Sequence, residues 1–258
     1  MTSSTPSVLI TGGGMGLGLA IVKKLLQGTR HSPPANVYTL TMAVSDEFKE
    51  LVSQSEGRLA YAMGDVTKFE DSKKAVDDIL LRWHRLDGVV VNAGITNLAP
   101  LKDLDYDTML KTLSVNAAAP VNTLRAALPE LRKHKGRVVF VTSSSSYQCH
   151  PTWAPYSCSK AALNSLALTL ANEEPDIASF AVSPGHVDTA MQSKIRSTDE
   201  SFEKLYKEHK LLPAEKPAAV LAALVMRGSR SEPAKDSKPL GAGAFVSWDD
   251  PALKEYHE

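Results

Sequence analysis

A short apolar segment that runs directly into a cluster of glycines constrains the fold of this chain more than any other feature. Residues 7–11 have the pattern of a buried strand, and residues 17–26 have the apolar spacing of a helix. The loop between them reads Thr11-Gly12-Gly13-Gly14-Met15-Gly16-Leu17-Gly18. Glycines here let backbone N–H groups approach a phosphate, and the helix that follows offers the positive end of its dipole. The segment therefore predicts a nucleotide-binding unit, although the spacing is not the general G-x-G-x-x-G fingerprint.

Strand-like and helix-like segments alternate along the rest of the chain. The pattern predicts strands at 7–11, 37–42, 59–63, 88–91, 137–142, 177–183 and 244–248, and helices at 17–26, 47–53, 69–83, 108–131, 154–172 and 216–226. This order predicts a doubly wound α/β fold of the Rossmann type, with a seven-stranded parallel sheet and helices on both faces. No linker divides the chain, so we interpret residues 1–258 as a single domain.

One long irregular stretch, residues 187–213, follows the sixth expected strand. It is polar and mixed in charge. We interpret it as a lid over the ligand crevice, because that crevice lies at the carboxyl ends of parallel strands. The alternative is a solvated loop with a short helix near residues 202–209.

Composition and charge exclude several classes of function. Lys plus Arg equal Asp plus Glu at 29 each, so bulk charge gives no reason to expect nucleic acid or an anionic membrane as a partner. Cys149 and Cys158 are too few for a disulfide framework and lack the spacing of a metal site, so we expect no metal. No signal peptide or membrane-spanning run is visible, which makes the cytoplasm the expected location.

Several further motifs lie after the expected strands, and together they resemble the short-chain dehydrogenase/reductase family from Val8 to about Trp248. The matching motifs are Thr11-Gly12-x-x-x-Gly16-x-Gly18, Asp65-Val66, Asn92-Ala93-Gly94, Ser114-Val115-Asn116, Ser143 with Tyr156-x-x-x-Lys160, and Pro184-Gly185-His186-Val187-Asp188-Thr189. Val91 stands where the family usually has asparagine, and the glycine-rich ending of many members is missing. The resemblance implies a nicotinamide cofactor, a small-molecule substrate and a homodimer or homotetramer. The residues expected to bind the cofactor are Gly12, Gly14, Met15, Gly16, Leu17, Gly18, Thr41, Asp65, Val66, Asn92, Ala93, Gly94, Tyr156, Lys160, Pro184, Gly185, Val187 and Thr189.

The expected catalytic residues are Ser143, Tyr156, Lys160 and Asn116. Tyr156 and Lys160 are four residues apart on an expected helix and so share a face. A nearby ammonium should lower the pKa of the tyrosine, which then exchanges a proton with a carbonyl or alcohol oxygen. Ser143 would hydrogen-bond the same oxygen, with its neighbours in the serine run 143–146 as alternatives. The resemblance gives Lys160 a ribose contact and gives Asn116 a water that relays protons.

The turn after the second expected strand bears on the choice of cofactor. An acid at this turn would select NAD by bonding the ribose 2′-hydroxyl, but residues 39–45 contain none. We therefore favour NADP(H), with NAD(H) as the alternative. Thr41 and Ser45 are candidates to accept the 2′-phosphate, while a basic partner is missing at the turn itself and could come from Arg30 or Lys49.

The sequence leaves the substrate open. Apolar candidates for its pocket lie in and before the irregular stretch: Tyr147, Trp153, Met191, Ile195, Phe202, Leu205 and Tyr206. They favour an apolar substrate, such as an aromatic or polyketide-like molecule. His186 is interpreted as a variable loop position without a catalytic role. Two other functions remain as alternatives: a non-redox enzyme on the same fold, such as a dehydratase, epimerase or cyclase, or a nucleotide-binding scaffold without turnover.

Overall fold

One parallel sheet organises the chain in the computed structural model, which describes residues 5–30, 32–196, 200–208, 210–228, 243 and 245–257. The seven strands lie in the order β3-β2-β1-β4-β5-β6-β7, and every neighbouring pair is parallel. Their bounds are β1 Ser7–Thr11, β2 Asn36–Thr41, β3 Leu59–Met63, β4 Gly88–Val91, β5 Arg137–Val141, β6 Ala178–Ser183 and β7 Phe245–Ser247. The doubly wound sheet expected from the sequence is confirmed; Ala244 of the seventh expected strand lies outside the described residues.

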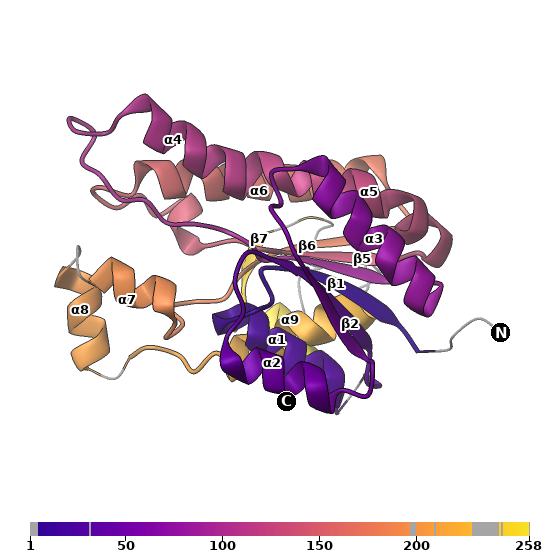
Figure 1. Cartoon of the computed structure of the whole chain (residues 1–258). Helices are drawn as coiled ribbons and strands as arrows, with labels where there is room; N and C mark the ends of the chain where they lie inside the picture. Colours follow the sequence, from indigo (N-terminus) through magenta and orange to yellow (C-terminus); the bar gives the residue numbers. More distant parts are fainter. Residues whose placement is uncertain are drawn as a thin grey trace.

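Helices cover both faces of this sheet (Figure 1). Their bounds are α1 Gly16–Gln27, α2 Asp46–Gln54, α3 Phe69–Trp83, α4 Tyr106–Leu113, α5 Ala119–His134, α6 Ala154–Glu173, α7 Ala190–Arg196, α8 Glu200–Lys207 and α9 Glu215–Arg227, with 3-10 turns at Ser144–Ser146 and Pro251–Tyr256. In Figure 1, α1, α2 and α9 lie on one face, and α3, α5 and α6 lie on the other. None of the helices described is long and apolar enough to cross a membrane.

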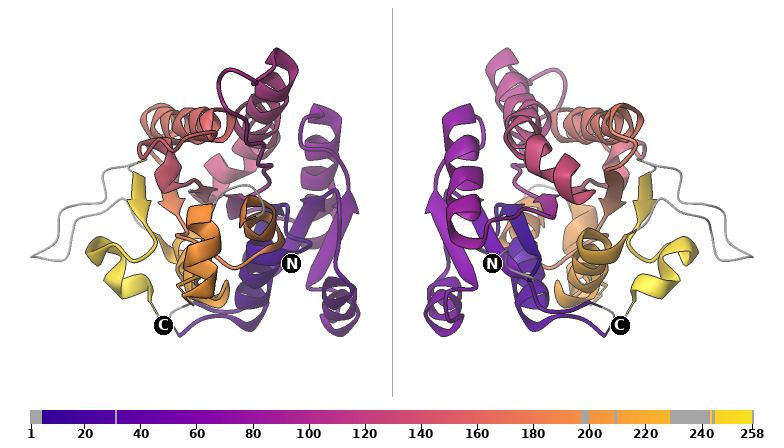
Figure 2. Two further views of the ribbon diagram at one scale, coloured as in Figure 1. Left: turned by 90° about the vertical axis from the view of Figure 1, so that its left-hand side faces the viewer. Right: turned by 90° about the vertical axis from the view of Figure 1, so that its right-hand side faces the viewer.

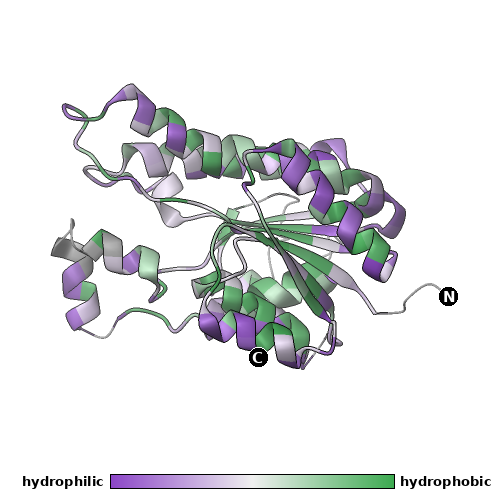
Figure 3. Ribbon diagram, in the orientation of Figure 1, coloured by the Kyte–Doolittle hydropathy of each residue, from purple (hydrophilic) through white to green (hydrophobic). Residues whose placement is uncertain are grey.

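The core consists of two apolar layers, one on each face of the sheet. In β5, Val139 and Val141 belong to the layer under α1 and α9, whereas Val138 and Phe140 belong to the layer under α3, α5 and α6. This alternation follows from the two-residue period of a strand. Both layers are apolar because both faces are covered, and the apolar sides of the helices face the sheet (Figure 3).

The helical stretch expected at 108–131, with Pro120 and Pro129 as candidate kinks or ends, is interrupted in the structure just before Pro120. Between α4 and α5 the backbone forms a π-helical turn at Ser114–Ala118. Pro120 lies in the first turn of α5 and has no N–H, so the Asn116 carbonyl cannot receive the α-helical bond from that position. The missing donor favours the wider hydrogen-bonding pattern, and such π-turns are frequent at functional sites.

The stretch 187–213 is more regular than expected, because it contains the helices α7 and α8. Both ends of the stretch are tied together: Leu212 N donates to His186 O at 2.8 Å, and Asp188 N donates to Leu212 O at 3.0 Å. In Figure 1 the two helices lie to the left of the sheet, and Figure 2 shows them in front of the sheet from that side and behind it from the opposite side. The lid interpretation stays a prediction; His209 of the expected short helix lies outside the described residues.

Candidate active site

A cavity of about 810 Å³ opens at the carboxyl ends of the strands. It lies where β1 has β2 on one side and β4 on the other, which is the point at which the chain reverses its direction across the sheet. Ligands of doubly wound sheets bind at this position. The volume is that of a typical small-molecule site.

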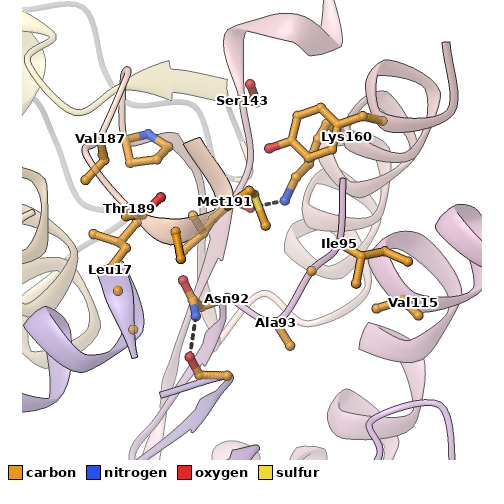
Figure 4. Close-up of a pocket in the computed structure, with 18 of the residues that line it drawn as sticks. Leu17, Asn92, Ala93, Ile95, Val115, Ser143, Lys160, Val187, Thr189 and Met191 are labelled. Carbon is orange, nitrogen blue, oxygen red and sulfur yellow. Dashed lines mark hydrogen bonds between the residues drawn. The ribbon is translucent and has the colours of Figure 1, made fainter. Parts of the chain in front are cut away.

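The glycine loop forms one wall of the cavity and is packed too tightly for side chains. A Cβ added to Gly18 would lie 2.1 Å from the Gly12 carbonyl oxygen, and one added to Gly12 would lie 3.0 Å from the Ala93 Cα. Asn92 fixes the loop, since its Nδ2 donates to Thr11 O at 3.1 Å and to Gly12 O at 2.9 Å (Figure 4). This bare backbone at the start of α1 fits the diphosphate of a dinucleotide.

Gly14, also expected to bind the cofactor, does not line the cavity. Its carbonyl accepts hydrogen bonds from Ser45 N at 3.0 Å and from Ser45 Oγ at 3.2 Å. The Ser45 hydroxyl also caps α2 by accepting from Phe48 N at 3.2 Å. Gly14 and Ser45 therefore join the glycine loop to α2, and the Ser45 hydroxyl already has two partners.

Asp65 and Val66, both expected to bind the cofactor, line one end of the cavity. Two hydrogen bonds from Thr67, one from its backbone and one from its hydroxyl, hold the pKa of the Asp65 carboxyl below its usual range. Thr41 also lines the cavity, and its hydroxyl donates to Ala43 O at 2.9 Å. Arg30 and Lys49 are not among the lining residues, and Lys49 pairs with Asp46 at 2.8 Å.

Ser143, Tyr156 and Lys160 meet at the other end of the cavity. Ser143 follows β5, whereas Tyr156 and Lys160 lie one turn apart on α6. The Lys160 Nζ lies 5.5 Å from the centre of the Tyr156 ring and donates to Val141 O at 2.8 Å. Figure 4 places Ser143 and Lys160 on the same side of the cavity, across from Leu17 and Thr189.

The serine run contributes one hydroxyl that is oriented by its neighbours. Ser143 Oγ accepts from Ser145 N at 3.2 Å and from Ser145 Oγ at 3.0 Å. Since Ser145 supplies both donors, the Ser143 proton remains for Tyr156, to which Ser143 is hydrogen-bonded. Ser144 and Ser145 also line the cavity, but the Ser145 hydroxyl is used in holding Ser143.

The sequence predicted a lowered pKa for Tyr156, but the surroundings of Tyr156 in the fold raise it. Burial raises the pKa of Tyr156 to about 12, and the hydrogen bond from Ser143 opposes this only in part. Burial also lowers the pKa of Lys160 to about 8. The sequence argument considered the neighbouring ammonium but not desolvation, which penalises the charged form of both groups.

The buried lysine gives a stability prediction. Its pKa is about 8 in the folded protein against an ordinary value of 10.5, so the unfolded state binds more protons between these values. Stability contributed by this group therefore rises as pH increases through that window. We expect the Tm of the wild type minus the Tm of Lys160→Met to increase as the pH rises from about 8 to about 10.5. Parallel Tm curves for the two proteins across the window would contradict the burial of this amine.

Asn116 does not line the cavity; it lies behind residues that do, and supports them from there. Its Oδ1 accepts from Ile95 N at 2.8 Å, and its Nδ2 donates to Ile95 O at 2.8 Å and to Ser159 Oγ at 3.0 Å. The side chain thus joins the loop after β4 to the catalytic helix α6. The π-turn places Asn116 between these two segments.

The motif after β6 crosses the cavity as the resemblance implies. Pro184, Gly185, Val187 and Thr189 all line it. Gly185 has a φ of +74°, a conformation that favours glycine, and an added Cβ would lie 2.8 Å from Leu212 Cδ1. This segment continues directly into α7, so the motif and α7 form one wall of the cavity.

The end of the cavity next to Tyr156 is largely apolar. Trp153, Met191 and Ile195 line it, and Trp153 meets the Tyr156 ring edge-on with 5.7 Å between ring centres. Leu205 packs behind them without reaching the cavity. Two other candidates do not contribute, since Tyr147 packs against Phe245 and Tyr206 is exposed and does not line the cavity. The Phe202 side chain lies outside the described residues.

Several lining residues were not expected from the sequence. They include Met42, Ile95, Lys111, Val115 and His150. Val115 directly precedes Asn116 and Ile95 directly follows the Asn92-Ala93-Gly94 motif, so position next to a motif could have indicated these two. Nothing in the sequence distinguishes Lys111 or His150 from ordinary surface residues, whereas Gln192, which also lines the cavity, lies in the stretch 187–213 that was interpreted as a lid.

Known proteins resemble this chain over most of its length. A family model described as short chain dehydrogenase matches residues 6–200. The chain is 33% identical over 252 residues to an uncharacterized oxidoreductase of Schizosaccharomyces pombe, covering 93% of this chain and 95% of the relative. It is 33% identical over 242 residues to benzil reductase ((S)-benzoin forming) of Saccharomyces cerevisiae, covering 86% and 90%. A short-chain dehydrogenase/reductase crystal structure from Saccharomyces cerevisiae matches with a TM-score of 0.88 at 32% identity, covering 98% of this chain and 100% of that one.

Proposed function

The chain belongs to the short-chain dehydrogenases, and from this premise we propose that it is an NADP(H)-dependent reductase of apolar ketones. The observation that carries the proposal is the convergence of Ser143, Tyr156 and Lys160 on the cavity that also contains the glycine loop. A cofactor on the loop and a carbonyl beside Tyr156 would then share one space. Fold alone would not support a reductase, because non-redox enzymes use the same fold.

The protein groups have separate roles in this proposal. When bound, the nicotinamide supplies the hydride for reduction and accepts it for oxidation. Tyr156 donates its phenolic proton to the carbonyl oxygen, and the raised pKa keeps this proton in place at neutral pH. Ser143 donates a hydrogen bond to the same oxygen as negative charge develops there. Lys160 is charged at neutral pH and favours release of the tyrosine proton.

The proposed substrate class follows from the apolar end of the cavity. Trp153 is 4% exposed and presents an aromatic wall beside Tyr156. Met191 and Ile195 from α7 complete an apolar surface. The relative named benzil reductase acts, by its name, on an aromatic ketone. These features support a flat, apolar or aromatic ketone as the substrate.

The choice of NADP(H) rests on the end of β2, where Thr41, Met42 and Ala43 line the cavity and contribute no carboxylate to repel a 2′-phosphate. We expect NADPH to bind more tightly than NADH in a fluorescence titration of the purified protein. Introducing the missing acid with Met42→Asp should reverse this order by about tenfold or more, because it repels the phosphate and bonds the free hydroxyl. Equal binding of both cofactors by the wild type would contradict the proposed preference.

The same proposal includes a homodimer or homotetramer. Apolar side chains on α4, α5 and α6 are exposed in the single chain, namely Leu110, Val121 and Leu168. Burial of such side chains favours association. Light scattering on the protein as it elutes from a size-exclusion column measures the mass of the assembly, which we expect to be two or four times that of one chain.

A further inference from the structure

Gln192 is a buried polar side chain at the cavity that has no role in the scheme above. It lies in α7, is 4% exposed and lines the cavity. Its Nε2 has no hydrogen-bond partner among the residues that the structure describes. Buried amide donors are almost always paired, since an unpaired one lowers the stability of the fold. The side chain is therefore suited to a partner that enters the cavity.

The position of Gln192 on α7 indicates which ligand it meets. Ile195 lies three residues further on, so both side chains share one face of the helix. Ile195 packs in a small cluster with Trp153 and Tyr156. Gln192 thus lies on the face of α7 that covers the catalytic tyrosine, and the neighbouring Met191 extends between Thr189 and Lys160 in Figure 4.

The charged residues around the cavity indicate that the ligand atom bonded by Gln192 is a neutral oxygen. Lys160 and the exposed Lys111 are the lysines of the described lining, which contains no arginine. His186 also lines the cavity, and burial with the nearby His150 lowers its pKa, which keeps the imidazole neutral at neutral pH. The described lining thus offers a substrate carboxylate no arginine, and the Lys160 Nζ already donates to the Val141 carbonyl. A carbonyl or hydroxyl oxygen would accept from the Gln192 amide without a cationic partner.

We propose that Gln192 donates a hydrogen bond to a second oxygen of the substrate, next to the carbonyl that Tyr156 protonates, and that it thereby selects vicinal diketones over simple ketones. The reacting oxygen is bonded by Ser143 and Tyr156, so the second oxygen is free for Gln192. A site that hydrogen-bonds a substrate oxygen discriminates against an analogue without it, because the buried group is then left unpaired. This inference rests on the proposed ketone reduction.

The test compares two ketones that differ by one oxygen. Benzil has two adjacent carbonyls between its rings, and deoxybenzoin has one. We expect Gln192→Met to lower the ratio of kcat/KM for benzil to that for deoxybenzoin by about tenfold, the loss of one hydrogen bond. The Kd of NADPH should stay unchanged. Gln192→Leu should behave in the same way, and it replaces Gln192→Met if that variant does not fold.

Gln148→Met is the matched control, because Gln148 is exposed and does not line the cavity. It should leave the ratio at the wild-type value. Equal losses on both ketones in the Gln192 variants, or a weaker Kd for NADPH with an unchanged ratio, would overturn the inference while leaving ketone reduction in place. A wild-type protein that reduces neither ketone would instead contradict the proposed function, and this inference with it.

Discussion

Replacing Tyr156 with phenylalanine is expected to lower kcat for ketone reduction by about a hundred- to ten-thousandfold, because the reaction loses its proton donor. The ring remains, so its edge-on contact with Trp153 is kept. The Kd of NADPH should change by less than about threefold, since the hydroxyl acts in the reaction more than in binding. Steady-state kinetics and a fluorescence titration on the same preparation measure both quantities.

Tyr147→Phe is the control for this substitution. Tyr147 is exposed, packs against Phe245 and does not line the cavity. Removing its hydroxyl should leave kcat at the wild-type value. If Tyr156→Phe retained most of the wild-type kcat, another group would have to supply the proton, and the assignment of Tyr156 would be wrong.

Gly18→Ala is expected to weaken NADPH binding by at least about a hundredfold, which abolishes measurable affinity at ordinary cofactor concentrations. The added Cβ would lie 2.1 Å from the Gly12 carbonyl oxygen and 2.8 Å from Asn92 Nδ2. The glycine loop must then move, and the backbone that faces the phosphates moves with it. The measurement is the Kd of NADPH, with the Tm recorded to follow the effect on folding.

Gly57→Ala is the control that separates a displaced glycine loop from the general effect of replacing a glycine. Gly57 lies far from the glycine loop in the sequence and does not line the cavity; it has a φ of +81°, and an added Cβ meets nothing within 4 Å. This variant should lose some stability through backbone strain but keep the wild-type Kd. A Gly18→Ala protein that folds and binds NADPH normally would show that this loop does not hold the cofactor.

The strands and helices were predictable because the sequence pattern of each one lies within a few neighbouring residues. The expected strands 7–11, 59–63 and 88–91 match β1, β3 and β4 residue for residue. Each is a short apolar run between polar or glycine-rich segments, and such runs can be assigned from neighbouring residues alone. The parallel arrangement of the strands followed from their alternation with helices.

The elements that the sequence did not predict depend on backbone hydrogen bonds or on tertiary contacts. Pro120 is a candidate kink in the sequence, but the form of the interruption, a π-turn at Asn116, depends on the backbone donor that Pro120 lacks. The helices α7 and α8 are polar over much of their length and are held by the pairing of Val187 with Leu212. Their apolar contacts gather around Trp153, which is distant in the sequence.

The site was predictable where residues belong to motifs and not where burial decides the chemistry. The glycine loop and the Tyr156–Lys160 pair were expected from spacing, and the structure brings them to one cavity. The direction of the tyrosine pKa shift was wrong, because desolvation depends on the surroundings of Tyr156 in the fold. Gln192 could not be recognised before the fold showed a buried amide without a partner.

The measurement that tests the central claim most directly is the transfer of isotope from cofactor to substrate. NADPH carrying deuterium at C4 of the nicotinamide, prepared separately as each stereoisomer, is incubated with the wild-type protein and an aromatic ketone. The account predicts that one of the two preparations places deuterium on the carbinol carbon of the alcohol product. If an alcohol forms and neither preparation labels it, its hydride does not come from the nicotinamide, and the protein is not a nicotinamide-dependent reductase.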